Sequence, residues 1–238
     1  MDTGPELSIV LPAFNEEALI AASVRAWAGA AEECVGNWEL LVVEDGSADG
    51  TAAVVEAMRG EMPQLGLLRH FKNRGYGAAV ANGLREARGE WVLFSDSDLQ
   101  FDPMDLLKLW ELRKRADLVC GYRAPRADPP TRRLYGALWS GLNAGLFDLP
   151  IRDLDCAFKL IRRGILDKIE LKSSGAFINA ELLSQAVQAG ARIIETPIQH
   201  LPRPSGEQSG ANPKVVVKAL GELLQIGGPL LIKTARRQ

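Results

Sequence analysis

Short apolar runs alternate with helical patterns along the first half of this 238-residue chain, and no other feature restricts the possible fold as strongly. Runs that are apolar along their whole length form strands buried on both faces, which is typical of parallel sheets. Helices between such strands imply a doubly wound sheet with helices on both faces. We therefore predict an α/β fold with a mostly parallel sheet, whose first strands are residues 7–12, 38–45, 64–71, 91–94 and 116–122.

The helices between these strands are marked by apolar spacing and by their ends. The first helix is expected to begin with Asn15 as its N-cap, because apolar residues recur at helical spacing after it. Asp102 followed by Pro103 predicts another helix start, with Asp as the N-cap and Pro at the first helical position. The further helices predicted in this part are residues 49–59, 75–88 and 103–115.

The second half changes character. Residues 123–133, RAPRADPPTRR, are rich in Arg and Pro and predict a linker or mobile loop. We expect one domain over residues 1–210 and a C-terminal helix over 211–238, which opens at Asn212-Pro213. Within the domain the predicted elements are a helix at 134–147, a strand-like stretch at 153–163, a helix at 179–189, a strand at 191–198 and a polar loop at 200–210.

Composition excludes several classes of protein. The net charge of −2 argues against a general nucleic-acid binder. Cys34, Cys120 and Cys156 are odd in number and lack CxxC spacing, which indicates a reducing compartment and neither a zinc site nor a disulfide framework. We expect no signal peptide, and no segment approaches the ~20 apolar residues of a membrane-spanning helix. A cytoplasmic location is therefore expected.

Two aspartates one residue apart, Asp96 and Asp98, follow the fourth predicted strand. They fall in a loop at the carboxyl end of that strand, which is where ligands bind in open α/β sheets. Two carboxylates so close repel each other unless a cation or a proton lies between them. With Gln100 as a further oxygen, the pair predicts a site for Mg²⁺ or Mn²⁺ together with substrate phosphates. The alternative is a solvated turn with helix-capping aspartates.

Asp45, Gly46 and Ser47 end the second predicted strand at the same edge of the sheet. Gly46 permits a tight turn, and Asp45 could accept hydrogen bonds from a base or a ribose. Alternatively, the three residues form an Asx-turn that opens the next helix. Two acidic strand ends in one sheet favour a nucleotide site.

The loops after the first and third strands are less specific. Glu16 and Glu17 suit the first turn of a helix, because the helix dipole favours acidic residues there. Residues 73–77, NRGYG, contain GxG without the full GxGxxG spacing of a dinucleotide fingerprint, which argues against an NAD-type Rossmann enzyme. This loop serves either a close approach of helix and strand or a phosphate contact.

Arginines concentrate in the second half, and histidines are scarce. Arginine suits bidentate recognition of phosphate, although each of these arginines could be a solvated charge. His70 and His200 are the only histidines, so no Ser-His-Asp or Cys-His set is predicted. We expect His70 to be a satisfied core residue and His200 to line a site. The arginines concerned are Arg123, Arg126, Arg132, Arg133 and Arg203.

Six motifs in order along the chain resemble the family 2 glycosyltransferases of the GT-A fold, most closely the polyprenyl-phosphate branch typified by dolichyl-phosphate mannosyltransferase. Glu44 departs from the pattern, since many members have Asp there, and so does Ala157, where many have Gly. The transmembrane pair that many relatives carry after the catalytic domain is not in this sequence, which resembles the soluble type. The motifs are VLPAFNEE (10–17), LLVVEDGSADGT (40–51), NRGYGAAVANGL (73–84), FSDSDLQFDP (94–103), RDLDCAFKLIRR (152–163) and HLPRPSGEQSG (200–210).

The resemblance implies a role for each matching residue. Asp96, Asp98 and Gln100 match the motif that binds metal and diphosphate, and Asp153 falls in the acceptor-side strand. Residues 1–122 would form the nucleotide-sugar and metal half of the domain, and 123–210 the acceptor half. Arg123, Arg133 and Arg203 match basic positions near the acceptor phosphate or the donor diphosphate. The donor side would consist of Pro12, Phe14, Glu16, Asp45, Gly46, Ser47, Asn73 and Gly75.

The implied activity is a metal-dependent, inverting transfer of a sugar from a nucleotide diphosphate sugar, such as GDP-mannose or UDP-glucose, to polyprenyl phosphate. A phosphate monoester has a second pKa of about 6, so it is already an anionic nucleophile at neutral pH. Such an acceptor needs arginines to hold it and no strong base, which fits the composition of the second half. One alternative is transfer to a sugar hydroxyl with Asp153 or Asp155 as base. The other is a non-catalytic module that binds a nucleotide sugar.

The C-terminal helix bears on the location of the protein. Apolar residues at 216, 220, 223 and 224 are surrounded by lysines and arginines, so the helix could lie on an anionic membrane surface. That placement would be peripheral, on the cytoplasmic face, with or without a membrane partner protein. The alternative is a helix packed on the catalytic core.

Overall fold

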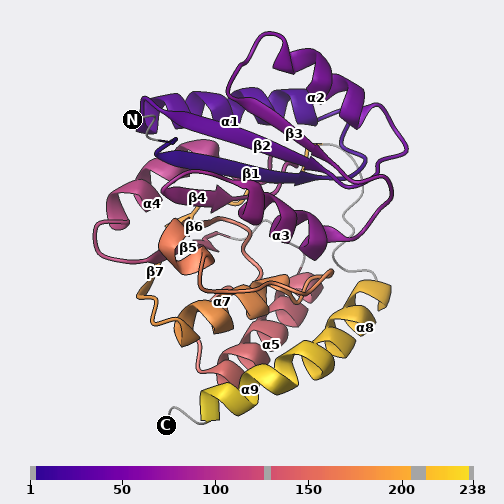
Figure 1. Ribbon diagram of the computed structural model, residues 1–238. Helices are drawn as coiled ribbons and strands as arrows, with labels where there is room; N and C mark the ends of the chain where they lie inside the picture. Colours follow the sequence, from indigo (N-terminus) through magenta and orange to yellow (C-terminus); the bar gives the residue numbers. More distant parts are fainter. Residues whose placement is uncertain (1–3, 126–129, 205–212, 236–238) are drawn as a thin grey trace.

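A seven-stranded sheet runs through the protein between two layers of helices (Figure 1). The computed structural model describes residues 4–125, 130–204 and 213–235. The strands are arranged in the order β3-β2-β1-β4-β6-β5-β7. They are β1 (Leu7–Ala13), β2 (Trp38–Glu44), β3 (Leu65–Arg69), β4 (Trp91–Phe94), β5 (Leu118–Arg123), β6 (Lys159–Arg162) and β7 (Ile193–Ile198).

The sheet is mostly parallel, as predicted. Strand β6 alone is antiparallel to its neighbours β4 and β5, whereas the other pairings are parallel. Every residue of β1, β2 and β4 is buried, which confirms the inference from their mostly apolar sequences. Such burial stabilises each strand through roughly 25 cal/mol for every Å² of apolar surface removed from water.

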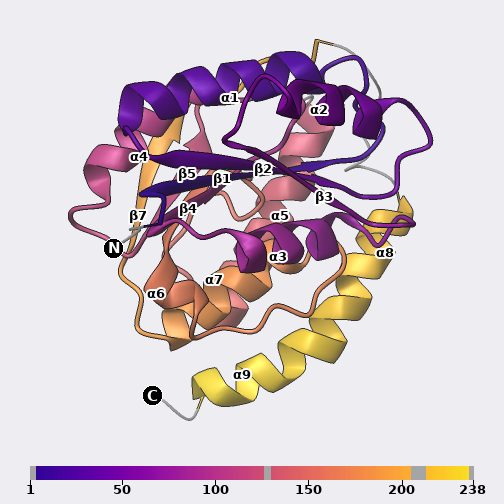
Figure 2. The same ribbon diagram turned by 45° about the horizontal axis from the view of Figure 1, so that its top comes forward.

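Helices cover both faces of the sheet, which confirms the predicted architecture. Figure 2 shows α1, α2 and α4 on one face and α3, α6 and α7 on the other. Trp27 on α1 packs against Phe158 in the core, with ring centroids 5.3 Å apart. The helical elements are α1 (Ile20–Cys34), α2 (Thr51–Arg59), α3 (Tyr76–Glu86), η1 (Pro103–Asp105), α4 (Leu106–Leu112), α5 (Pro130–Phe147), α6 (Arg163–Leu166), α7 (Ile178–Gln188), α8 (Pro213–Glu222), η2 (Leu223–Gly227) and α9 (Gly228–Ala235).

The predicted helix start at Asn15 is wrong, whereas the one at Asp102 is confirmed. Helix α1 begins at Ile20, and Asn15 has a left-handed φ of 55°. Its side-chain oxygen accepts a hydrogen bond from Ala48 N at 2.9 Å, so it joins two loops and caps no helix. The Asp102 side chain accepts from Met104 N, with Pro103 following it. Asp102 bonds to a neighbouring backbone amide and caps a helix, whereas Asn15 bonds to Ala48, which is distant in sequence.

Two predictions for the second half need correction. Residues 123–133 are not simply a linker, because Arg123 ends β5 and α5 already begins at Pro130. The stretch 153–163 contains only a short strand, β6, preceded by a loop. Arg126 and most of the loop 200–210 lie outside the described residues. The predicted division at residues 122 and 123 falls within β5 and stays a prediction.

The C-terminal helix continues through the Gly-Gly-Pro sequence at 227–229. It consists of α8, the π-helical segment η2 and α9. A π-helical turn absorbs extra residues without ending the helix. Among the described residues, no helix combines the length and the apolarity that crossing a membrane requires.

Candidate functional site

Loops gather at one edge of the sheet because six strands share one direction. β4 and β5 are both antiparallel to β6, so β5 and β7 run the same way as β1 to β4. The loops that follow these strands therefore emerge at the same, carboxyl edge, which is where open α/β sheets bind ligands. The candidate residues of the sequence lie mainly in these loops.

Asp96 lies in the loop after β4, close to Asp98 and Tyr76. Burial, and then the charge of Asp98, raises the pKa of Asp96 to about 7. The Tyr76 hydroxyl donates a hydrogen bond to Asp96, which lowers that pKa in part. Burial and the Asp96 carboxylate in turn raise the pKa of Tyr76 well above its usual value. The loop thus holds two carboxylates whose mutual repulsion favours a proton or a cation between them.

Asp98 also forms an ion pair that reaches across the site. One guanidinium nitrogen of Arg203 lies 3.3 Å from Asp98 Oδ2, and the other lies 2.6 Å from Glu16 Oε1. Burial raises the pKa of Glu16, and the hydrogen bond and charge of Arg203 oppose that effect. Arg203 therefore joins the loop after β1 to the loop after β4, although the three residues are far apart in sequence.

A short pairing of two segments brings Arg203 to this position. Phe101 forms an isolated antiparallel bridge with His200. Leu201 N donates to Gln100 O at 2.8 Å, and the Gln100 side-chain amide donates to Leu201 O at 3.3 Å. The sequence predicts Gln100 as a metal ligand. In the structure its side chain is buried and bonds to this segment. His200 is likewise buried, and its ring lies 5.6 Å from that of Phe101.

Asp45 fixes the loop that follows β3. Its Oδ1 accepts from His70 Nδ1 at 2.6 Å and from Arg74 N at 2.9 Å, and its Oδ2 accepts from Gly75 N at 2.8 Å. His70 is thereby a satisfied buried residue, as predicted. Gly46 has a φ of 71°, and an added Cβ would lie 2.4 Å from the Lys72 backbone. In this structure the predicted nucleoside contact, Asp45, holds the backbone of residues 70–75 in place.

The loops after β1 and β2 are joined by hydrogen bonds. Asn15 N donates to Ser47 Oγ and Glu16 N donates to Thr51 Oγ1, both at 2.9 Å. Pro12 is buried in β1, and its carbonyl accepts from Ser97 Oγ at 2.9 Å. Phe14 is 45% exposed at the mouth of this loop. Pro12 lies in β1, and five further residues of the proposed donor side lie in two loops of fixed relative position: Phe14, Glu16, Asp45, Gly46 and Ser47.

Residues 73–77 make a close approach, but to another loop and not to the strand that the sequence predicted. Gly77 N donates to Ser174 O at 3.1 Å. Gly75 has a φ of 101°, and an added Cβ would lie 2.3 Å from Ser174 O. Asn73, by contrast, is exposed. Glycine is needed at 75 because both the backbone conformation and the neighbour exclude a side chain.

Two residues predicted for the acceptor side, Arg123 and Asp153, form a buried ion pair. Arg123 donates from Nε and Nη2 to the two Asp153 carboxylate oxygens, each at 2.7 Å, and both side chains are less than one-tenth exposed. Bidentate pairs of this kind are among the strongest charged hydrogen bonds. Asp153 is thus the partner of Arg123 in this structure. Arg133 is exposed on the first turn of α5.

Sequence reasoning missed two residues, Tyr76 and Lys159. Lys159 on β6 is fully buried, and its Nζ donates to Leu154 O, Cys156 O and Asn179 Oδ1. Its positive charge lowers the pKa of Asp96. A lysine in an apolar strand gives no signal of such a role, whereas Tyr76 could have been noticed between two glycines.

The chemistry of the acidic loop fits a divalent cation. Among the described residues, no group of three or more His, Cys, Asp or Glu side chains forms a metal cage. Mg²⁺, however, is commonly bound by one or two carboxylates together with substrate phosphates. Burial, and then the charge of Asp98, raises the pKa of Asp96, so ionising both carboxylates is unfavourable unless a cation lies between them. Asp96 and Asp98 could therefore hold such an ion jointly with a diphosphate.

The chain resembles curated proteins that act on polyprenyl phosphates. It is 32% identical over 206 residues to dodecaprenyl-phosphate galacturonate synthase of Rhizobium johnstonii, covering 84% of this chain and 60% of that protein. It is 28% identical over 215 residues to undecaprenyl-phosphate 4-deoxy-4-formamido-L-arabinose transferase of Sodalis glossinidius, covering 89% of this chain and 64% of that protein. The chain thus spans less than two thirds of the length of either relative.

The fold is that of the GT-A glycosyltransferases. A solved structure of the mannosyltransferase PcManGT from Pyrobaculum calidifontis, in complex with GDP-Man and Mn²⁺, matches with a TM-score of 0.65 and 20% identity, covering 98% of this chain and 70% of that one. Residues 8–170, more than half of the chain, match Glycosyl transferase family 2. The chain belongs to glycosyl transferase family 2.

Proposed function

We propose that this chain transfers a sugar from a nucleotide diphosphate sugar to a polyprenyl phosphate. The observation that carries the proposal is the meeting of the Asp96–Asp98 pair with Arg203 and Glu16 at the carboxyl edge of the sheet. Carboxylates beside guanidinium groups suit a substrate that brings a metal-bound diphosphate and a second phosphate. Two relatives are named for dodecaprenyl phosphate and undecaprenyl phosphate, and these names support a lipid acceptor.

Asp96 and Asp98 would hold a divalent cation, Mg²⁺ or Mn²⁺. Such an ion supplies Lewis acidity and neutralises charge on the departing diphosphate. The Mn²⁺ and GDP-Man in the mannosyltransferase structure support both the ion and the class of donor. GDP-mannose and UDP-glucose are the donor types to test first, and inversion by one in-line displacement is the stereochemistry we propose.

The residues of the chain itself would position the two phosphate-bearing substrates. Asp45 holds residues 74 and 75 in place beside the donor, and Glu16 lines the same side. Arg203 would exchange Asp98 for a phosphate oxygen, since a guanidinium binds either anion in the same bidentate manner. Arg123 and Arg133 complete the basic acceptor side.

The acceptor needs no general base, because its phosphate is already ionised at neutral pH. The rival proposal, transfer to a sugar hydroxyl, needs Asp153 or Asp155 as that base. Asp153 is disfavoured for the task, since both its oxygens accept from Arg123. We further propose that the chain works peripherally at the cytoplasmic face of a membrane, where a lipid acceptor would be found.

The change Asp98→Asn tests this function. It keeps the size of the side chain and removes the charge, so we expect transfer to fall by about a hundredfold or more. The measurement is the incorporation of labelled sugar into an organic-extractable, acid-labile product. The matched control is Asp102→Asn, which alters a helix cap outside the ion-pair cluster and should leave turnover nearly unchanged.

Three outcomes would contradict the proposal. Near-normal turnover of the Asp98→Asn protein would rule out its role with the metal. A labelled product that stays in water as a glycan would favour the hydroxyl acceptor. Binding of a nucleoside diphosphate without release of sugar would favour a non-catalytic binding module.

A further inference from the structure

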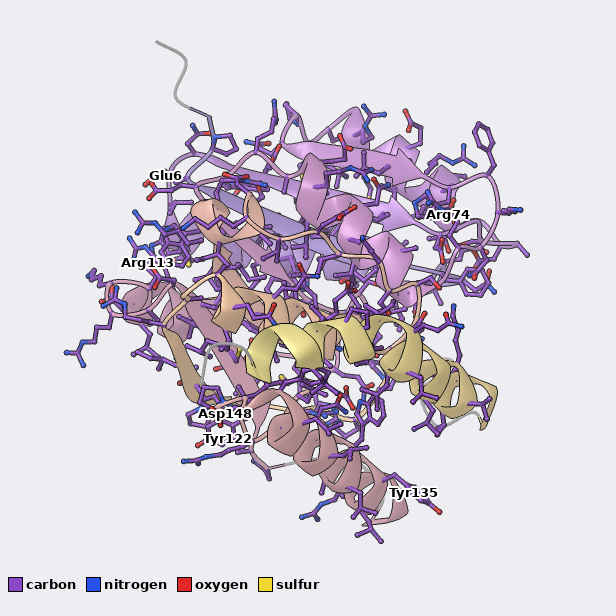
Figure 3. All side chains as sticks on the ribbon, turned by 60° about the horizontal axis from the view of Figure 1, so that its bottom comes forward. Glu6, Arg74, Arg113, Tyr122, Tyr135 and Asp148 are labelled. Carbon is purple, nitrogen blue, oxygen red and sulfur yellow. The ribbon has the colours of Figure 1, made fainter. Side chains whose placement is uncertain are left out.

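One side of helix α5 exposes a row of large apolar side chains. Leu134, Leu138, Leu142 and Leu146 follow one another in steps of four, so they lie along one face of the helix. They are between 38% and 62% exposed. Tyr135 is 72% exposed, and Figure 3 shows it pointing outward near the start of α5. Apolar patches of this extent on a protein surface mark interaction sites.

The C-terminal helices add a second row. Val216, Val217 and Leu220 on α8 and Leu224 on η2 are between 44% and 79% exposed. Helix α5 contacts α9, which continues from α8 through η2. These four residues and the five on α5 form what we call the α5–α8 apolar face. It holds nine of the fourteen large hydrophobic residues that are exposed in the described part of the chain.

The charges on these helices have one sign. Residues 130–147 contain two arginines and no acidic residue. Residues 213–235 contain three lysines and a single acid, Glu222, which is buried. Glu222 accepts from Ser173 Oγ at 2.7 Å and from Ser174 N at 3.1 Å. Neither helical segment therefore exposes a carboxylate, although the exposed Asp148 directly follows α5.

We propose that the α5–α8 apolar face rests on an anionic lipid bilayer. Helices with an apolar face, basic borders and no acids lie in the plane of the boundary between head groups and acyl chains. The inference rests on the proposed function, because a lipid acceptor could then stay in the bilayer while its phosphate enters the site. Helix α5 begins shortly after Arg123 along the chain and α8 shortly after Arg203, so both lead away from the basic acceptor side.

A second copy of the chain fits this face less well. In a two-fold dimer the same patch of each subunit faces its counterpart. Residues 130–147 and 213–235 together contain five basic residues and one acid, the buried Glu222, so two copies would bring like charges together. An anionic lipid surface supplies the missing negative charge.

The test compares vesicle binding of the full chain with that of two double variants. Leu138→Glu with Leu142→Glu adds two charges to the centre of the face. Met104→Glu with Leu107→Glu adds the same charges at η1 and α4, where the side chains are 44% and 36% exposed. Cosedimentation is measured with vesicles of phosphatidylcholine alone and of phosphatidylcholine with phosphatidylglycerol, and circular dichroism checks that each variant is folded.

We expect the unaltered chain and the Met104/Leu107 variant to bind the anionic vesicles. The Leu138/Leu142 variant should bind at least about tenfold more weakly, because it lacks two leucines that the bilayer would bury. Failure of the unaltered chain to bind, or equal binding by both variants, would overturn the proposal. So would a dimer that the Leu138/Leu142 change dissociates while no protein binds vesicles, since a second copy would then cover the face.

A separate assay distinguishes this inference from the proposed function. Transfer to a short, water-soluble isoprenyl phosphate is measured without vesicles. The Leu138/Leu142 variant should keep this activity, because the face does not contact the acidic loop. If the unaltered chain bound vesicles but did not transfer sugar, the proposed function would be wrong and the bilayer-binding face would be supported. If it transferred sugar but did not bind vesicles, the proposed function would be supported and the bilayer-binding face would be wrong.

Discussion

At the scale of single residues, the site contains ion pairs and a titrating carboxyl group that a bound substrate and cation would rearrange. Arg203 lies between Asp98 and Glu16, so a cation already balances these two carboxylates. Asp96 has a different balance, since burial and Asp98 raise its pKa to about 7. Below about pH 7 a proton on Asp96 would neutralise charge that a divalent ion would otherwise offset, and Arg203 already pairs with Asp98 and Glu16.

The titration of Asp96 predicts a pH dependence of metal binding. A cation binds the carboxylate and not the acid, so a proton competes with it below the pKa. We expect the affinity for Mn²⁺ with a nucleoside diphosphate to be constant above about pH 7 and to fall up to about tenfold per pH unit below it. Isothermal titration calorimetry across that range measures the effect.

Asp96→Asn is the control for this profile, because it removes the titrating group and leaves the titration of the nucleotide. The altered protein should bind Mn²⁺ weakly and with a flatter pH dependence. The raised pKa also affects the metal-free protein: its folded state holds the proton more tightly than its unfolded state. The contribution of Asp96 to stability therefore falls as the pH rises from about 4 to about 7. Equal affinity on both sides of pH 7 in the unaltered chain would contradict the assignment.

At the scale of elements, a chain of contacts links the C-terminal helix to the donor-side loop. Glu222 at the end of α8 binds the segment of Ser173 and Ser174, and that segment packs on Gly75 and Gly77. Gly75 N in turn donates to Asp45. The helix that carries part of the apolar face is thereby attached to the loop beside the proposed donor site.

Two glycine substitutions test how tightly these elements fit. Gly75→Ala meets Ser174 O at 2.3 Å and a φ of 101°, so we expect it to destabilise the protein by about 1–3 kcal/mol. Gly29→Ala is the matched control, since Gly29 is exposed within α1 and has no atom within 4 Å of an added Cβ. It should stabilise the protein by about 1 kcal/mol. Urea unfolding measures both changes, and a neutral Gly75→Ala would show that the loops are not in close contact.

At the scale of the whole molecule, one mostly parallel sheet places six strand ends at one edge. Strands β5 and β7, on the proposed acceptor side, join the strands of the proposed donor side through β6, so both belong to the same sheet. Ligand binding at this edge should therefore stabilise the whole fold and not one part of it.

Thermal unfolding tests that expectation. A nucleoside diphosphate and Mn²⁺ together, at about a hundred times their Kd, should stabilise the folded chain by about 2.7 kcal/mol. For a protein of this size the rise in Tm is about 5–10 °C. Either ligand alone should give less, and Asp98→Asn should remove most of the difference. A shift of equal size without the metal would count against joint binding.

Much of this arrangement could be predicted because it depends on short stretches of sequence. Buried strands such as β1, β2 and β4 are mostly apolar, and the Asp102-Pro103 helix start needs only neighbouring residues. The acidic pair at 96 and 98 was likewise visible, because it directly follows a buried strand. Asn15 was misjudged, since its partner, Ala48, lies across the site in another loop.

The sequence by itself determined the layered α/β architecture and the order of the acidic and basic loops, because apolar periodicity and turn chemistry act over a few residues. Tertiary structure alone decided which charges meet. Arg203 pairs with Asp98 and Glu16, Arg123 with Asp153, and Lys159 is buried beneath the site. The physical reason is that such contacts depend on strand order and on the direction of β6, which no local pattern encodes.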